Sequence, residues 1–250
     1  MLTLTPDAAT VIRNLVEQSV RCGVARFVQI STDKAVNPTN VMGASKLMAE
    51  KLVCSANAYA RKGHQVFAAT RFGNVLGSRG SVLQVFYRQI ASGGPVTLTD
   101  PAMTRFIMSL SDAVKLVLDS VFLAKGGEIL VTKMPVVRIA DLAAVMIEEL
   151  APNFGRTAED IKIVQIGSKP GEKFFEELMN QEEIRRTIEL RDYFVITPAL
   201  RAINRDIEYT YPGVVSDAAP AHPYNSSTIR PMDRETLRRY LRTHSDLLRP

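Results

Sequence analysis

Helix-like and strand-like segments alternate along most of this chain, and this alternation limits its possible folds more than any other feature. Apolar residues recur at helical spacing in residues 7–22, and a short apolar run typical of a buried strand follows at 24–30. The same succession continues, with helices predicted at 41–62, 82–90, 111–123, 139–150 and 172–179 and strands at 65–70, 96–99, 128–132 and 161–166. Such alternation predicts an α/β protein with a largely parallel sheet.

Beyond residue 192 the alternation weakens and prolines become frequent. This part of the sequence predicts an irregular surface segment that ends in a short helix beginning at Asp233. No internal repeat and no low-complexity tract interrupts the pattern.

Composition narrows the cellular setting. The 250 residues are 46% hydrophobic and 23% charged, which suits one large or two small globular domains. No apolar run reaches the ~18 residues that a membrane-spanning helix needs, and the N-terminus lacks a signal-peptide pattern. Two cysteines are too few for a disulfide framework. We therefore expect a cytoplasmic protein with no membrane span and no metal site.

The net charge of +5 leaves several classes of partner open. A basic chain can bind nucleic acid, a membrane surface or a phosphorylated small molecule. Arg234, Arg238 and Arg242 recur every four residues, which is typical of one solvated helix face. Because the C-terminal segment also has few aromatic residues for stacking on bases, we predict no nucleic-acid partner.

The chain lacks the strand, Gly-x-Gly-x-x-Gly turn and helix that hold a dinucleotide pyrophosphate in open α/β sheets. The nearest glycine cluster, at Gly73, Gly77 and Gly80, has the wrong spacing and lies in a long polar loop. A dinucleotide site within this chain alone is therefore doubtful.

Polar residues follow the predicted strand at 24–30, where the carboxyl ends of parallel strands face a ligand crevice. Ser31-Thr32-Asp33-Lys34 offers an adjacent carboxylate and amine that can exchange protons. Serine, threonine and aspartate also favour helix caps, so a purely structural role stays open. Further on, Met42 and Lys46 are four residues apart and share one face of the next helix.

The run from Ser31 to Lys46 resembles the active-site segment of UDP-N-acetylglucosamine 4,6-dehydratases, CapD/CapE-type extended short-chain dehydrogenases/reductases of polysaccharide biosynthesis. In most short-chain dehydrogenases the helix carries Tyr-x-x-x-Lys, whereas Met42 stands in the tyrosine position, a variant this group also uses. The resemblance implies that Thr32, Asp33 and Lys34 are catalytic, together with Met42 and Lys46. It also implies NADP or NAD as cofactor, contacted by Ser31, Lys46 and Arg71.

Three later segments resemble the substrate-binding motifs of the same family, in the expected order. They are Arg71 to Val82, Leu98 to Phe106, and Gly167 to Lys173. The resemblance implies that the substrate contacts Asn74, Ser81, Thr99, Arg105, Lys169 and Glu172. Ser81 also precedes a helix with free N–H groups, and arginine suits a diphosphate because its planar fork binds phosphate oxygens in pairs. Two structural alternatives stay open: a salt bridge by Arg105 and a helix-start role for Glu172.

The resemblance implies the C-terminal part of a Rossmann-like doubly wound parallel sheet plus a smaller α/β substrate-binding region. We expect a partial nucleotide-binding domain at 1–135 with interleaved substrate segments, and a substrate-binding region at 136–250. The implied function is a lyase that dehydrates UDP-N-acetylglucosamine for capsule or O-antigen synthesis, with or without inversion at C5. The alternative is a truncated, inactive UDP-sugar-binding fragment or a half-enzyme. We expect a homo-oligomer or association with a missing N-terminal half.

Overall fold

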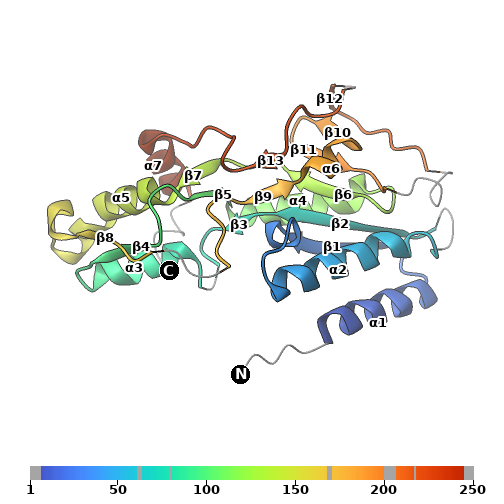
Figure 1. Cartoon of the computed structure of the whole chain (residues 1–250), viewed down its shortest axis with the longest axis horizontal. Helices are drawn as coiled ribbons and strands as arrows, with labels where there is room; N and C mark the ends of the chain where they lie inside the picture. The colour runs from blue at the N-terminus through green and yellow to red at the C-terminus, as the bar shows by residue number, and fades with distance from the viewer. Residues whose placement is uncertain are drawn as a thin grey trace. The chain divides into compact units, whose positions relative to one another are not determined.

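The computed structural model describes residues 7–60, 64–78, 80–167, 171–199, 207–216 and 218–244 (Figure 1). The chain forms two compact units that interleave along the sequence. The first unit comprises Met1–Phe72, Val114–Lys133 and Glu177–Tyr224, and the second comprises Gly73–Ala113, Met134–Glu176 and Asn225–Pro250. The division into domains at residue 135 stays a prediction.

A sheet forms the centre of the first unit. Strands β1 (Arg26–Thr32), β2 (Val66–Phe72) and β6 (Ile129–Thr132) are parallel, and β1 and β2 pair along their full length. Strands β11 (Tyr193–Ile196), β10 (Thr187–Leu190) and β12 (Val214–Ser216) continue the sheet in antiparallel orientation. Among the described residues the order is β1-β2-β6-β11-β10-β12. The predicted α/β class is confirmed, whereas the antiparallel half was not predicted.

Helices cover both faces of this sheet. Val16 of α1 (Asp7–Arg21) and Val53 of α2 (Val41–Ala56) are buried together with Phe67 of β2. The next residue, Ala68, points to the opposite face because side chains alternate along a strand. There it packs with Ala124, which directly follows α4 (Leu110–Leu123). The parallel part of the sheet around β2 is therefore covered on both faces, as parallel sheets generally are.

The second unit is built around helix α5 (Ile139–Leu150), whose Leu142 and Met146 are fully buried. Phe86 of α3 (Val82–Ala91) and Leu237 of α7 (Arg234–Thr243) belong to the same apolar cluster. Short strands complete the unit: β3 (Asn74–Val75), β5 (Thr104–Met108) and β7 (Val136–Arg138) form one sheet, and β4 (Val96–Leu98) pairs in parallel with β8 (Ile163–Gln165). Two 3-10 turns follow α5, η2 (Ala151–Phe154) and η3 (Ala158–Asp160).

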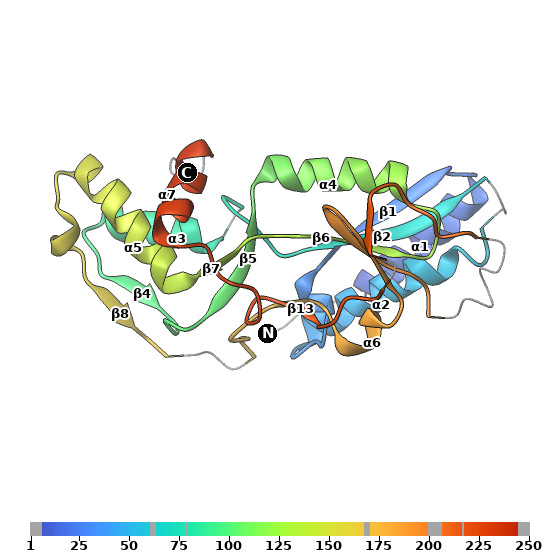
Figure 2. The ribbon, with the colours of Figure 1, turned by 90° about the horizontal axis from the view of Figure 1, so that it is seen from above.

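The arginines that repeat along α7 are paired with acids on α5 (Figure 2 shows the two helices). Arg234 lies 3.0 Å from Asp141, and Arg242 lies 2.8 Å from Glu149. Arg238 contacts Glu149 at 3.1 Å and also pairs with Glu148. These arginines therefore contribute to packing of α7 within the second unit, and their charge is matched by carboxylates.

The helix predicted at 172–179 is wrong. The chain instead forms a turn at Gly171, an irregular stretch, and strand β9 (Glu177–Met179), which pairs with β13 (Tyr224–Asn225) before the short helix α6 (Gln181–Ile184). The backbone carbonyls of this stretch are used by arginine side chains. Arg105 donates to the carbonyls of Lys173 and Phe174, and Arg71 donates to that of Leu178. These tertiary hydrogen bonds replace the local ones that a helix would make.

Candidate active site

The residues predicted to transfer protons lie together at the carboxyl end of β1 in the first unit. The 3-10 turn η1 (Asp33–Ala35) begins there, capped by the Thr32 hydroxyl, which accepts from the backbone N–H of Lys34 at 3.4 Å. The Thr32 hydroxyl donates to Asp33 Oδ1 at 2.5 Å, and Lys34 Nζ lies 3.2 Å from the same oxygen. Asp33 is only 3% exposed, whereas 43% of the Lys34 side chain is accessible. Both the capping role and a chemical role therefore fit this segment.

A glycine in α2 allows this helix to lie close to the turn η1. Asn40 caps the helix by accepting from the backbone N–H of Gly43 at 2.9 Å. A Cβ at Gly43 would lie 2.5 Å from the Lys34 carbonyl oxygen and 2.9 Å from Pro38 Cβ. The close approach of α2 to the turn therefore requires a residue without a side chain at position 43.

Gly43→Ala is expected to destabilise the first unit by about 1–3 kcal/mol, because the new methyl group overlaps backbone that cannot move freely. Chemical denaturation would measure this change. Ser45→Ala is the matched control, since it changes the same helix at a half-buried position and removes only a local bond to the Met42 carbonyl. Equal stabilities for the glycine and serine variants would contradict the close approach.

Met42 and Lys46 lie on the exposed side of α2. Met42 is 55% exposed, and Lys46 is exposed and makes no ion pair with a described residue. One helical turn further along α2, Glu50 is fully buried. The face with Met42 and Lys46 is thus accessible beside η1.

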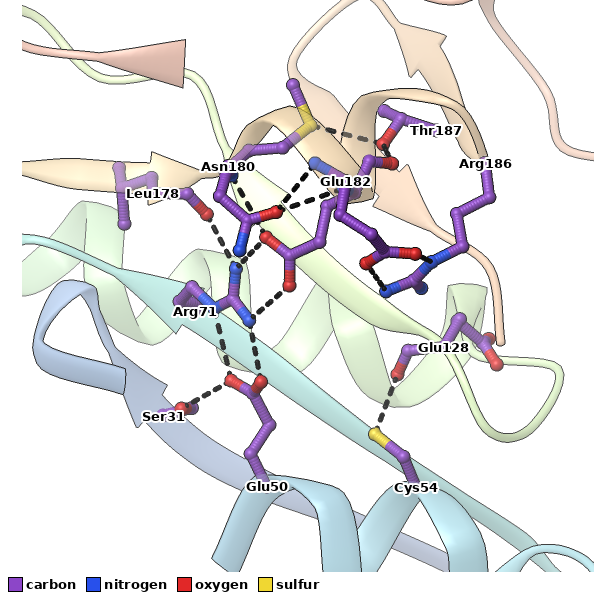
Figure 3. Close-up of polar contacts among 12 residues, drawn as sticks. Ser31, Glu50, Cys54, Arg71, Glu128, Leu178, Asn180, Glu182, Arg186 and Thr187 are labelled. Carbon is purple, nitrogen blue, oxygen red and sulfur yellow. Dashed lines mark hydrogen bonds and ion pairs between the residues drawn. The ribbon is translucent and has the colours of Figure 1, made fainter. Parts of the chain in front are cut away.

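A buried ion-pair network joins β2, α2 and α6 (Figure 3). Arg71 of β2 is fully buried between Glu50 of α2 and Glu183 of α6. Its Nη2 lies 2.6 Å from Glu50 Oε1 and 3.0 Å from Glu183 Oε1. Its Nη1 donates to Glu183 Oε2 at 3.0 Å and to the Leu178 carbonyl at 2.8 Å, and its Nε donates to Glu50 Oε2 at 3.1 Å. Ser31 of β1 donates to Glu50 Oε2 at 2.7 Å.

The network uses the full donor capacity of Arg71. A guanidinium has five N–H groups, and the five contacts account for all of them. Burial alone would lower the pKa of Arg71, but Glu50 and Glu183 outweigh it and hold that pKa above the usual range. Burial raises the pKa of Glu183, but Arg71 outweighs it, so the net pKa is lowered. The predicted cofactor contacts of Ser31 and Arg71 stay predictions, since both side chains are engaged with protein groups.

Five of the six residues predicted to bind the substrate line one cavity of about 320 Å³ in the second unit. They are Asn74, Ser81, Thr99, Arg105 and Glu172, and apolar side chains such as Phe86 and Met103 complete the wall. The sixth, Lys169, lies outside the described residues. Segments far apart in sequence thus supply one pocket.

Two features make this pocket suitable for an anion. Ser81 precedes helix α3 without capping it, and its buried hydroxyl has no partner in the described part of the chain. The first backbone N–H groups of a helix also lack internal partners and attract negative charge. Arg105, from β5, adds a positively charged side chain that is 14% exposed and that also donates to the backbone carbonyls of Lys173 and Phe174.

Arg105 also forms salt bridges, which is the structural role that the sequence analysis kept as an alternative. Its Nε lies 3.4 Å from Glu176, and its Nη2 lies 3.9 Å from Glu172. Thr99 donates to Glu172 at 3.4 Å, so Glu172 belongs to the pocket wall and starts no helix. Glu176 and the Glu50–Arg71–Glu183 network were missed from the sequence. A lone glutamate gives no local signal for a long-range contact.

Comparisons with known proteins identify the family of the chain. A family model described as "Polysaccharide biosynthesis protein" matches residues 8–198. The chain belongs to this family. Its matches include curated proteins named as UDP-sugar dehydratases and 4-epimerases, so the family is one of nucleotide-sugar enzymes.

Individual relatives match only in part. An uncharacterised membrane protein of Methanocaldococcus jannaschii is 59% identical over 186 residues, which are 74% of this chain and 56% of that protein. A UDP-N-acetylglucosamine 4,6-dehydratase (inverting) of Campylobacter jejuni is 38% identical over 199 residues, 79% of this chain and 56% of the relative. The crystal structure of Pen from Bacillus thuringiensis superposes with a TM-score of 0.83 at 37% identity, covering 95% of this chain and 68% of Pen.

The chain spans 56% of each of these two curated relatives. Within the part that the structure describes, no helix combines the length and apolar character needed to cross a membrane.

Proposed function

We propose that this chain carries the proton-transfer segment and the substrate pocket of a UDP-N-acetylglucosamine 4,6-dehydratase of surface-polysaccharide biosynthesis. The observation that carries the proposal is the single cavity lined by Asn74, Ser81, Thr99, Arg105 and Glu172. The Campylobacter relative of that name supports the choice of sugar nucleotide. The alternative is a fragment that binds a UDP-sugar in the same pocket but does not convert it to product.

We propose roles in the reaction for the residues in and beside η1. Lys34 is proposed as the base that removes the C5 proton once C4 is a ketone, and Asp33 as the acid that protonates the departing C6 hydroxyl. Thr32 is proposed to hydrogen-bond near the C4 oxygen. The contacts of Asp33 with both Thr32 and Lys34 support this assignment, because proton transfer needs groups within hydrogen-bond reach. Met42 carries no titratable proton and is proposed to shape the site.

The exposed face of α2 fits one end of a nicotinamide cofactor. Lys46 is proposed to hold the nicotinamide ribose, since its ammonium group is accessible on the face it shares with Met42. NAD(P)+, when bound, would accept a hydride from C4 and return it at C6. Among the described residues no glycine-rich strand–turn–helix unit holds a pyrophosphate, so the fit is limited to the nicotinamide end.

Titration of the folded chain with UDP and with UDP-N-acetylglucosamine tests the proposal. Both ligands are expected to bind, and Arg105→Lys is expected to weaken both by about tenfold or more, because lysine loses the paired donors for a diphosphate. Arg88→Ala is the control: Arg88 is exposed on α3 and does not line the cavity.

Absence of binding by the folded wild-type chain would refute the proposal. A second measurement separates the two functional alternatives. Mass spectrometry after incubation with UDP-N-acetylglucosamine and NAD(P)+ is expected to detect a 4-keto-6-deoxy product. Binding without any product would favour the non-catalytic alternative.

A further inference from the structure

One buried carboxylate, Glu176, contacts two residues of the substrate pocket. Its oxygens lie 3.0 and 2.9 Å from Asn74 Nδ2, and Oε1 lies 3.4 Å from Arg105 Nε. Glu176 is 6% exposed and does not itself line the cavity. It therefore lies behind the pocket wall and holds two of the side chains that face a ligand.

The backbone of Glu176 is fixed by a serine near the C-terminus. The Glu176 N–H donates to Ser226 Oγ at 2.9 Å, and the Ser226 N–H donates to the Glu176 carbonyl at 2.8 Å. Ser226 Oγ in turn donates to the Thr104 carbonyl of β5 at 3.1 Å and is fully buried. The carboxylate thus has a defined position relative to Arg105, which follows Thr104.

This contact sets the orientation of the Asn74 amide. A carboxylate only accepts hydrogen bonds, so it must face the NH2 group of Asn74 and not its oxygen. No described residue donates to Asn74 Oδ1, while Asn74 itself lines the cavity. The side chain therefore offers the pocket an acceptor. An acceptor attracts hydroxyl or amide N–H groups and repels the oxygens of a diphosphate.

We propose that Glu176 is a positioning residue that makes Asn74 recognise a donor on the sugar, while Arg105 and the start of α3 take the diphosphate. The inference rests on the proposed function and divides its pocket into two subsites. Asn74 then contributes to the preference for a UDP-sugar over UDP and contributes nothing to UDP itself. Glu176 acts on that preference only through Asn74.

The test compares dissociation constants for UDP and UDP-N-acetylglucosamine, measured by calorimetry on the whole chain. Asn74→Ala is expected to lower the preference for the UDP-sugar about five- to tenfold, the effect of one hydrogen bond, with UDP affinity within about threefold of wild type. Glu176→Gln is expected to lower the preference in the same direction, because a neutral amide no longer fixes the Asn74 NH2 group. A general structural loss would weaken both ligands together and leave the preference unchanged.

Two comparison variants sharpen the result. Glu172→Gln also removes a carboxylate near Arg105, but the described hydrogen bonds of Asn74 go to Glu176, so this variant is expected to shift both ligands together. Glu159→Gln, at an exposed site in η3, is expected to shift neither. If Glu176→Gln does not fold, Asn74→Ala alone decides.

An unchanged preference in Asn74→Ala, or equal weakening of both ligands, would overturn this inference and leave the proposed function standing. Failure of the wild-type chain to bind either ligand would overturn the proposed function and this inference with it.

Discussion

Replacing Arg71 by alanine is expected to lower the free energy of unfolding by about 3–5 kcal/mol. The substitution leaves Glu50 and Glu183 facing each other in the interior, and both side chains are nearly inaccessible to water. It also removes the donor to the Leu178 carbonyl. Buried charges without a partner cost far more than an exposed ion pair is worth, because water cannot solvate them. Urea denaturation followed by circular dichroism would measure the loss.

The matched control is Arg13→Ala. Arg13 and Glu17 form an exposed pair on α1 at 3.8 Å, with 60% and 54% of their side chains accessible. Removal of this arginine is expected to change stability by less than about 0.5 kcal/mol. Similar losses for both variants would contradict the burial argument. Replacement of Arg71, Glu50 and Glu183 together by apolar residues should recover most of the stability, since no lone charge then remains.

The Arg71 variant should also change the dependence of stability on pH. The pKa of Glu183 is lowered in the folded protein by Arg71, so the stabilisation it provides is present above the unfolded carboxyl value of about 4.3 and is lost as the pH falls through the lower folded value. Without Arg71, burial would raise the pKa of Glu183, and acidification would then favour the fold. The difference between wild type and variant is therefore expected to be largest near pH 7 and to shrink toward pH 4.

Apolar periodicity and short local motifs explain why some helices and strands could be predicted correctly from the sequence. The apolar periodicity of α5 and the short apolar runs of β1 and β2 are local signals, and all three elements are found within two residues of their predicted bounds. The segment at 172–179 failed because its composition favours a helix while its carbonyls bond to Arg71 and Arg105 from elsewhere in the chain. Propensity is a weak preference that such contacts override.

The same distinction separates the parts of the candidate site. Asp33 and Lys34 are adjacent in sequence, so their contact could be expected from the motif alone. Glu50 lies four residues after Lys46, which suggests an exposed helical pair, yet it is buried against Arg71. The ion-pair partner of a buried charged residue depends on which strand and helix pack against each other in the folded protein. The sequence gives no local sign of that packing.

The largest functional effect is expected for Lys34→Ala in a reaction that needs no hydride transfer. A UDP-4-keto-6-deoxy-hexose has an acidic C5 proton next to its C4 ketone. In D2O, a base that removes this proton and returns a deuteron to C5 leaves the compound otherwise unchanged. If Lys34 is that base, the wild-type chain should accelerate deuterium incorporation at C5, and Lys34→Ala should slow the enzymatic rate by about 10²–10⁴-fold. Proton NMR would follow the C5 signal.

Two further variants assign the effect to Lys34 within this exchange reaction. Lys51→Ala removes an exposed lysine from α2 and should leave the rate unchanged, which excludes a general effect of charge. Asp33→Asn keeps the shape of the side chain that contacts Lys34 Nζ at 3.2 Å but removes the acid proposed for the C6 hydroxyl. Because C5 exchange involves no C6 departure, Asp33→Asn should slow exchange much less than Lys34→Ala. Equal losses in both variants would mean that Asp33 and Lys34 act as one unit in proton removal, and an unchanged rate in Lys34→Ala would place the C5 base elsewhere.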